Sequence, residues 1–318
     1  MPFVDIVLGG PDLSGTNTQI EDIIALFKQQ GRSVRDLRGT EIDALFHAQE
    51  FSSLNFGCTS LKEFLAERKE FDHFYDGVVH SLCKKLFDGG TNQDLQVASM
   101  VKNDITTYIN PDSADIWIME EPPKRGAGQT NRTFEQQRTK YGSLIHPLSA
   151  AHCHQAYRSD EFFRFRKVLR EKSKIIVRSR SEESACYQIH HPQQLPDGIS
   201  REDYLGLPGH QFAFGHPPTH LFIVCGPETW TEADYLELKK QRSTGRKLDD
   251  HELNPAYQVL VNQRYATSWL EELYEQGCRL YHAEPPKIFR FSIYDSKEAI
   301  REQMTKRLRE ILKSVKQY

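Results

Sequence analysis

The chain opens with a segment that has the pattern of a strand, a glycine-containing turn and a helix. An apolar run at residues 3–8 leads to Gly10, Gly15 follows five positions later, and a helical pattern covers Thr18–Gln30. In this context backbone N–H groups and a helix N-terminus can hold a phosphate group. The common phosphate-loop pattern GxxxxGK[ST] places lysine after the second glycine. Here Thr16 occupies that position.

The phosphate-binding hypothesis assigns the nucleotide contacts to Gly10, Ser14, Gly15, Thr16, Asn17 and Thr18. Asn17 takes the first hydroxyl position of the pattern, whereas Thr18 still offers a hydroxyl to a magnesium ion. Loss of the lysine removes a charge that stabilises a transferred phosphoryl group, so catalysis would need a cation from elsewhere. The alternative interpretation is an ordinary strand-to-helix turn whose helix is capped by Thr18.

The remaining pattern predicts an α/β protein that forms a single domain over residues 1–318. Five apolar runs predict strands, at residues 3–8, 114–119, 174–177, 220–225 and 287–293. Continuous apolar runs separated by helical stretches are typical of buried parallel strands with crossover helices. Helical patterns cover Ala256–Tyr274 and Lys297–Val315. Residues 40–112 contain helical patterns and no convincing strand, which predicts a helical insertion.

Composition narrows the functional classes. The net charge of −3 gives no overall attraction to nucleic acid, which argues against nucleic acid as a partner. No segment approaches the roughly 18 apolar residues of a membrane span, and the apolar N-terminal stretch is too short for a signal peptide. The six cysteines form no CxxC pair, so we expect reduced thiols in a cytoplasmic protein. Adjacent residues rarely point one way, which disfavours the tract at residues 152–154 (HCH) as a metal site.

Several segments together resemble the thymidylate kinase family. The loop GGPDLSGTNTQ is similar to that family's EGxDGxGKTTQ, and Asp12 stands where the family contacts the sugar hydroxyl of the acceptor nucleotide. Glu121, within IMEEPPKRGAG, resembles the REPGG turn after the family's second strand. Arg180 and Ser184 align with the motif DR[YF]xxSxxAYQ. Tyr187 and Gln188 arrive one residue earlier than in that motif, and the resemblance implies that they contact the acceptor.

Two further segments follow the same order. Arg158 stands 22 positions before Arg180, the spacing of the family's base-contacting arginine, and His154 stands where the family stacks a phenylalanine on the base. The loop Lys239–Asp250 is similar to the family's arginine-bearing lid. Its basic residues Arg242, Arg246 and Lys247 would close over ATP and replace the missing lysine.

The resemblance implies a three-layer P-loop kinase fold with a central five-stranded parallel sheet. It also implies transfer of the ATP γ-phosphate, with Mg²⁺, to a pyrimidine deoxynucleoside monophosphate such as dTMP or a modified relative. In this scheme Arg180 holds the acceptor phosphate, Arg125 supplies further charge beside it, and Glu121 positions a hydrated Mg²⁺. Members of the family commonly form homodimers, although the sequence itself does not fix the oligomeric state.

Departures from the family pattern keep other interpretations open. Thr16 and Asn17 replace the lysine and hydroxyl residue, Gly9 replaces a glutamate, and Ser179 replaces the aspartate before Arg180. These losses motivate a catalytically inactive nucleotide-binding module as the second hypothesis. A kinase acting on a modified pyrimidine within nucleic acid is the third.

Individual residues also have simpler interpretations. Arg180 would pair with Glu182 or Glu183, and Arg158 would form a surface ion pair. In the same view, His154 is an ordinary packed histidine. The basic residues of Lys239–Asp250 would then be a solvated loop.

Overall fold

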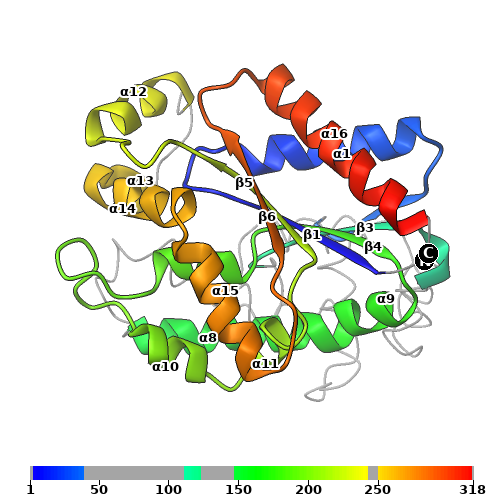
Figure 1. Cartoon of the computed structure of the whole chain (residues 1–318), viewed down its shortest axis with the longest axis horizontal. Helices are drawn as coiled ribbons and strands as arrows, with labels where there is room; N and C mark the ends of the chain where they lie inside the picture. Colours follow the sequence, from blue (N-terminus) through cyan, green and yellow to red (C-terminus); the bar gives the residue numbers. More distant parts are fainter. Residues whose placement is uncertain (1–2, 39–110, 123–146, 243–249, 317–318) are drawn as a thin grey trace, which may run out of the picture.

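The computed structural model describes residues 3–38, 111–122, 147–242 and 250–316 (Figure 1). Within these ranges six strands form one parallel sheet in the order β2-β3-β4-β1-β5-β6. The strands are β1 (Val4–Gly9), β2 (Val34–Asp36), β3 (Ile116–Glu120), β4 (Ile175–Ser179), β5 (His220–Cys225) and β6 (Lys287–Ser292). The predicted α/β class with a parallel sheet is confirmed.

The five apolar runs of the sequence each form a strand, but the sheet has a sixth that the sequence did not predict. Strand β2 has three residues and lies at the edge of the sheet, where it pairs only with β3. Val34 is half-buried and Arg35 and Asp36 are exposed, so the strand has no apolar run by which to recognise it. A short, charged strand is usual at a sheet edge, because charge discourages pairing with other chains.

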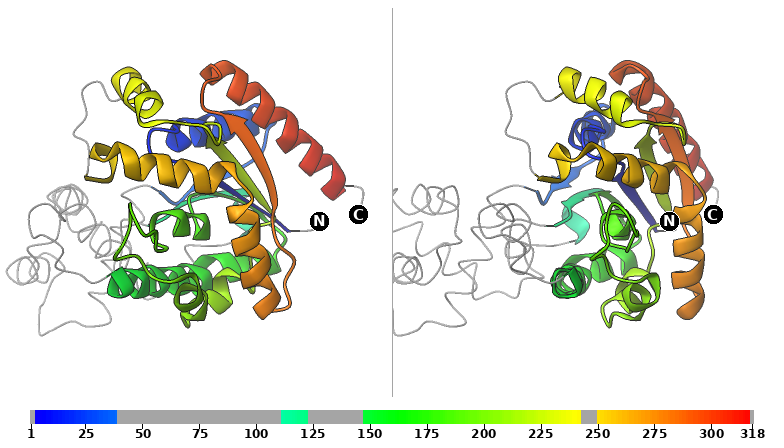
Figure 2. Two further views of the ribbon diagram at one scale, coloured as in Figure 1. Left: turned by 60° about the vertical axis from the view of Figure 1, so that its left-hand side comes forward. Right: turned by 90° about the vertical axis from the view of Figure 1, so that its left-hand side faces the viewer.

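Helices cover both faces of the sheet (Figure 2). On one face α1 (Thr16–Gln29), α12 (Glu232–Arg242) and α16 (Lys297–Lys316) pack on a core that includes Ile6 and Leu8 of β1. On the other face Val7 of β1 packs with η4 (Glu182–Tyr187), α10 (Arg201–Gly206), α11 (His210–Ala213), α14 (Pro255–Ala266) and α15 (Trp269–Leu280). Both faces of β1 are therefore apolar, which explains its unbroken apolar run.

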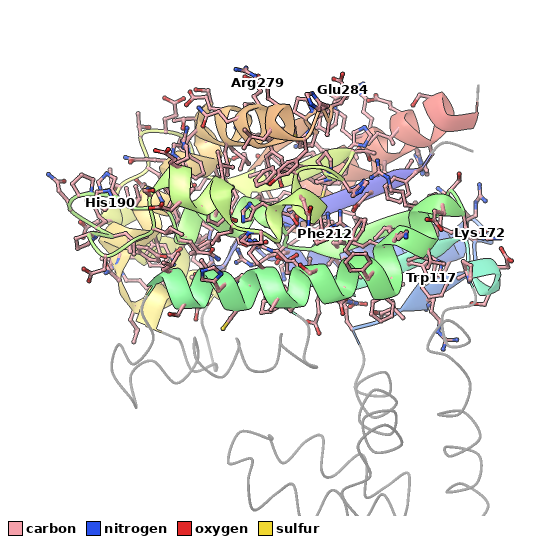
Figure 3. All side chains as sticks on the ribbon, turned by 90° about the horizontal axis from the view of Figure 1, so that it is seen from below. Trp117, Lys172, His190, Phe212, Arg279 and Glu284 are labelled. Atoms are coloured by element: carbon pink, nitrogen blue, oxygen red, sulfur yellow. The ribbon has the colours of Figure 1, made fainter. Side chains whose placement is uncertain are left out.

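Strand β3 is covered by a long helical segment with an irregular centre. This segment comprises α8 (Pro147–Glu161), a π-helical turn (Phe162–Arg166) and α9 (Lys167–Glu171). Phe165 and Leu169 from it pack against the buried Trp117 of β3. Figure 3, seen from below, shows α8 running along this face of the molecule. An extra residue in a helical turn is often found at functional positions, and here the turn ends with the buried Arg166.

All six strands point the same way, so their carboxyl ends meet at one edge. In Figure 1 this is the edge at which β1 leads towards α1, and α12, α13 (Asp250–Leu253) and α14 lie beside it. Figure 3 marks the two ends of the sheet with Lys172, just before β4, and His190, in the segment after it. Strand β1 lies between β4 and β5, where the chain changes side, and parallel sheets bind ligands at such a switch point.

The structure corrects three boundaries predicted from the sequence. Helix α1 begins at Thr16 rather than Thr18. The predicted helix Ala256–Tyr274 is two helices, α14 and α15. Arg290 favours the break, because its guanidinium donates to the carbonyl oxygens of Tyr265 and Thr267 at the end of α14, in place of a further helical turn. The predicted loop Lys239–Asp250 begins later than expected, because α12 continues to Arg242.

The predicted insertion at residues 40–112 falls almost entirely outside the described residues; its last two residues belong to a short 3₁₀ helix, η2 (Pro111–Ser113). None of the described helices combines the length and apolar character needed to cross a membrane.

Candidate functional site

The loop between β1 and α1 leaves a helix N-terminus open. Three of its residues have positive φ angles: Gly10 (149°), Leu13 (67°) and Gly15 (84°). A Cβ atom on Gly10 would lie 2.2 Å from the carbonyl oxygen of Val224, so only glycine fits there. Gly15 occupies the N-cap position without a side-chain cap. The predicted alternative that Thr18 caps the helix is therefore wrong, since Thr18 is the third residue of α1.

The first turn of α1 is available to an anion. Among the described residues, none accepts a hydrogen bond from the backbone N–H groups of Thr16, Asn17 or Thr18. Asn17 and Thr18 are exposed, whereas the side chain of Ser14 is buried, so Ser14 can offer a ligand only its backbone. Gln19 fixes the loop from below by donating from Nε2 to the carbonyl oxygen of Ser14 at 3.0 Å. Uncapped N–H groups at a helix N-terminus favour phosphate or carboxylate.

Arg180 reaches this loop from the end of β4. Its backbone has a φ of 67°, and its N–H donates to the carbonyl oxygen of Leu8. The guanidinium donates to the carbonyl oxygen of Gly10 at 3.3 Å and to Asp12 Oδ1 at 2.9 Å, and it lies 5.1 Å from the ring centre of Tyr187. Burial acts to lower the pKa of Arg180, but Tyr187 and Asp12 outweigh it and raise that pKa. The predicted alternative pairing with Glu182 or Glu183 is wrong.

Asp12 is held on both sides. Its Oδ1 accepts from Arg180, and its Oδ2 accepts from Nε2 of Gln258 on α14 at 2.8 Å. The Asp12 backbone N–H in turn donates to Gln258 Oε1 at 3.3 Å. Tyr187 also contacts the loop, donating to the Gly10 carbonyl oxygen at 3.3 Å. Asp12, Arg180 and Tyr187 thus come together as predicted, whereas the sequence did not reveal Gln258.

A second cluster lies next to the loop, around Glu121 and Arg158. Glu121 follows β3, and its N–H donates to the carbonyl oxygen of Ser179 at the end of β4. Arg158 Nε lies 2.5 Å from Glu121 Oε1, and its Nη2 donates to the carbonyl oxygen of Ser181 and to Ser184 Oγ. Arg158 is 3% exposed, so the predicted alternative of a surface ion pair is wrong. Its Nη1 donates to the Tyr204 hydroxyl, so four of the Arg158 N–H groups form hydrogen bonds within the protein.

His154 belongs to the same cluster. Its Nδ1 lies 2.7 Å from the Tyr157 hydroxyl, and that hydroxyl donates to Glu121 Oε1 at 3.1 Å. His154 is buried, with its ring tilted against Tyr157, as a packed histidine would be. Gln188 is half-buried, and among the described residues its side-chain oxygen has no partner. The structure thus brings Glu121, His154 and Arg158 together but places Gln188 outside their hydrogen bonds.

Beneath both clusters lies a buried ionic network that the sequence analysis missed. Asp5 of β1 is fully buried and accepts from Arg178 Nε at 2.9 Å and from Arg166 at 3.3 Å. Arg166 also lies 4.0 Å from Glu182, and Arg178 lies 3.8 Å from Glu121. Burial acts to raise the pKa of Glu182, but its arginine neighbours outweigh it and lower that pKa to about 2. The available signal was an aspartate inside an apolar strand, which requires a buried partner.

Glu183, which the sequence analysis named only as an alternative partner of Arg180, differs from its neighbours. It is 0% exposed, and neither carboxylate oxygen has a hydrogen-bond partner among the described residues. Burial raises its pKa to about 8, opposed by Arg180. It lies against Gly9: a Cβ atom on Gly9 would meet Glu183 Cγ at 2.8 Å. This raised pKa favours the protonated form of the carboxyl group at the base of the loop at neutral pH.

Of the three predicted lid residues, the structure describes only Arg242, which lies on a helix. Arg242, the last residue of α12, donates to the carbonyl oxygens of Leu13 at 2.8 Å and Ile293 at 2.9 Å. Its guanidinium therefore supports the loop from outside rather than standing free for a phosphate. Arg246 and Lys247 lie outside the described residues, as does Arg125 of the predicted acceptor site.

Metal ligands were assigned to Thr18 and Glu121. Both oxygens of Glu121 face arginine side chains, and Thr18 is exposed on α1. Within the described ranges no group of three or more His, Cys, Asp and Glu side chains is arranged to hold a metal ion. The tract at residues 152–154 lies on α8, with His152 exposed and His154 buried, so the two rings face different surroundings.

A scan of the sequence against models of protein families finds no match, and a search among curated proteins finds none either.

Proposed function

We propose that this chain binds a nucleoside triphosphate at the loop of residues 10–18 and phosphorylates a pyrimidine deoxynucleoside monophosphate, as its resemblance to thymidylate kinases implies. One observation carries the proposal: Arg180 contacts the loop through Gly10 and Asp12, while Arg158 bonds the carbonyl oxygen of the next residue, Ser181. Arg180 thus lies between the loop whose backbone N–H groups can bind phosphate and the polar cluster around Glu121 and Arg158. Phosphoryl transfer needs two substrates held in line with positive charge between them.

The loop fits a phosphate chain through its backbone. Gly10 has no room for a side chain, no described side chain caps α1, and a Cβ on Gly15 would meet only Gln19 Nε2, at 3.9 Å. ATP supplies the phosphoryl group, and residues 15–18 would hold its phosphates by N–H groups and the helix dipole.

The fit to Mg²⁺ through Glu121 is poor. Mg²⁺ prefers free carboxylate and phosphate oxygens, and the Glu121 carboxylate is already paired with Arg158 and faces Arg178. A metal ion that displaced Arg158 from the Glu121 carboxylate would leave a buried guanidinium without its ion-pair partner. We therefore derive no step through a Glu121-bound metal, and assign Glu121 to orienting Arg158 in the acceptor cluster.

The second candidate is a nucleotide-binding module without catalysis, and the charge near the loop favours it. Arg180 is paired with Asp12, and Arg242 donates to two carbonyl oxygens. Neither guanidinium is free to stabilise a transferred phosphoryl group in place of the lysine missing at Thr16. Under the kinase hypothesis this charge comes from Arg246 or Lys247.

One experiment separates the two candidates. The purified chain is incubated with labelled ATP, Mg²⁺ and each deoxynucleoside monophosphate in turn, and ADP binding is measured by calorimetry. The kinase hypothesis predicts a diphosphate product, lost in Arg180→Ala and kept in Arg279→Ala, whose side chain is exposed on α15. Binding of ADP without product from any acceptor would reject the kinase and support the module. Absence of ADP binding would reject both.

A further inference from the structure

Gly9 and Glu183 occupy one space at the base of the loop. A Cβ atom on Gly9 would lie 2.8 Å from Glu183 Cγ, 2.9 Å from its Oε1 and 3.0 Å from Ile223. Real Cβ atoms do not approach other atoms so closely, so Gly9 is glycine because the Glu183 side chain fills its position. Gly9 is the last residue of β1, directly before the loop. The Glu183 carboxyl group therefore packs where the strand becomes the loop.

The surroundings of Glu183 favour the neutral acid. Both of its oxygens lack a hydrogen-bond partner in the described part of the chain, although the residue is fully buried. An uncompensated buried carboxylate is costly, so such a group keeps its proton. The titratable and charged groups that interact with it electrostatically are Glu121 after β3, Arg158 on α8, Arg180 after β4, Glu182 and Cys186 on η4, Tyr265 on α14 and Tyr274 on α15.

We propose that Glu183 is a positioning residue of the phosphate loop, which admits an anion while Glu183 is protonated and loses affinity when Glu183 ionises. The inference rests on phosphate binding by this loop. Ionisation releases a proton to solvent and leaves a negative charge at Gly9, which opposes a bound phosphate electrostatically. It also offers Arg180 a second carboxylate, in competition with Asp12 and the Gly10 carbonyl oxygen through which Arg180 holds the loop.

The burial of Glu183 raises its pKa to about 8, which places this transition within a testable range. ADP affinity is measured by calorimetry from pH 6.5 to 9.5 for the wild-type chain, Glu183→Gln and the exposed control Glu275→Gln. Glutamine has the shape of the neutral acid but cannot ionise. Because the titration of ADP itself affects all three proteins equally, the ratio of wild-type to Glu183→Gln affinity reports only the ionisation of Glu183.

We expect wild type and Glu183→Gln to bind ADP equally at pH 6.5, and wild type to bind about tenfold more weakly at pH 9.5. Glu183→Leu, which also lacks the ionisable proton, should keep a pH-independent ratio to Glu183→Gln, and Glu275→Gln should follow wild type. Parallel profiles for wild type and Glu183→Gln would overturn the assignment while leaving nucleotide binding intact. Absence of ADP binding in all variants at every pH would instead reject phosphate binding, and the inference with it.

Discussion

Arg180 Nη2 lies 2.9 Å from Asp12 Oδ1, which joins the carboxyl end of β4 to the loop after β1. Both side chains are about one-fifth exposed, so the pair is partly shielded from water. An ion pair in such a position contributes more than a fully exposed one, because the solvent screens it less. The contact also explains the positive φ of Arg180, which turns the side chain from the strand end towards the loop.

Replacing Arg180 tests this contact directly. Arg180→Ala should lower nucleotide turnover by about a hundredfold, because the guanidinium fixes the loop through Gly10 and Asp12 and its loss would misplace the bound phosphates. Arg180→Lys should not restore it, because an ammonium group cannot bond Gly10 and Asp12 together as a planar guanidinium does. Steady-state kinetics measures both. Turnover by Arg180→Lys equal to that of wild type would show that only the charge matters.

Thr16→Lys restores the residue typical of a phosphate loop. Thr16 is the first residue of α1 and is half-buried, whereas the next two residues, Asn17 and Thr18, are exposed. The kinase hypothesis predicts a rise in turnover, about tenfold or more, because a cation near the transferred group stabilises the transition state. Tighter ADP binding with no product would favour the binding module. Thr16→Met, which adds length without charge, is the matched control.

Arg242 and Arg246 should behave differently although both were predicted lid cations. Arg242 bonds two carbonyl oxygens, so Arg242→Ala should reduce the free energy of unfolding by about 1–3 kcal/mol and weaken ADP binding. Arg246→Ala should lower turnover about a hundredfold and leave unfolding and ADP affinity unchanged. Urea unfolding and kinetics on the two variants check the contrast. A catalytic loss in Arg242→Ala with unchanged stability would reverse the assignment.

The sequence predicted the parts of this fold that depend on continuous local patterns. Strands β1, β3, β4 and β5 have apolar runs because they are almost wholly buried, whereas β6 lies at the sheet edge and is recognised by Ile288, Phe289 and Phe291 although most of it is only half-buried. Helix α1 shows its apolar face as Ile20, Ile23, Ile24 and Phe27. Strand β2 lacks such a run because its edge position leaves it partly exposed. The break between α14 and α15 depends on Arg290, which is distant in sequence.

The sequence predicted the site residues that belong to a recognisable motif, and it missed those that only the folded chain brings to the site. Asp12, Arg180 and Tyr187 follow strand ends that meet at one edge of a parallel sheet, so their order in sequence indicated their proximity. Gln258 contacts Asp12 across 246 positions, and no local pattern marks it. Glu183 entered the sequence analysis only as an alternative ion-pair partner of Arg180, and glutamate is rarely fully buried, so its burial was not predicted. Its side chain packs against Gly9, which is 174 positions away, and no local pattern marks that contact.

Asp5 balances two buried arginines, so its removal should be severe. Asp5→Asn leaves Arg166 and Arg178 without their shared carboxylate, and breaking a buried pair in this way costs about 3–5 kcal/mol. We expect the free energy of unfolding in urea to fall by that amount. Asp115→Asn is the control, because Asp115 pairs with Ser33 near the surface and should cost less than about 1 kcal/mol. Equal effects in the two variants would show that the network does not bear on stability.

Glu182 and Glu183 predict opposite dependences of stability on pH. The pKa of Glu182 is lowered to about 2, so its stabilising contribution is present above the ordinary glutamate pKa and is lost as the pH falls towards 2. The pKa of Glu183 is raised to about 8, so the folded chain keeps a proton that the unfolded chain releases. The free energy of unfolding should therefore decline as the pH rises from about 4 to about 8.

In ligand-free urea unfolding, the free energy of unfolding of Glu183→Gln should match that of wild type near pH 4 and exceed it by about 1–3 kcal/mol at pH 9, because the variant buries no charge. Glu275→Gln should follow wild type throughout, and a constant offset between Glu183→Gln and wild type would mean that Glu183 does not ionise in this range.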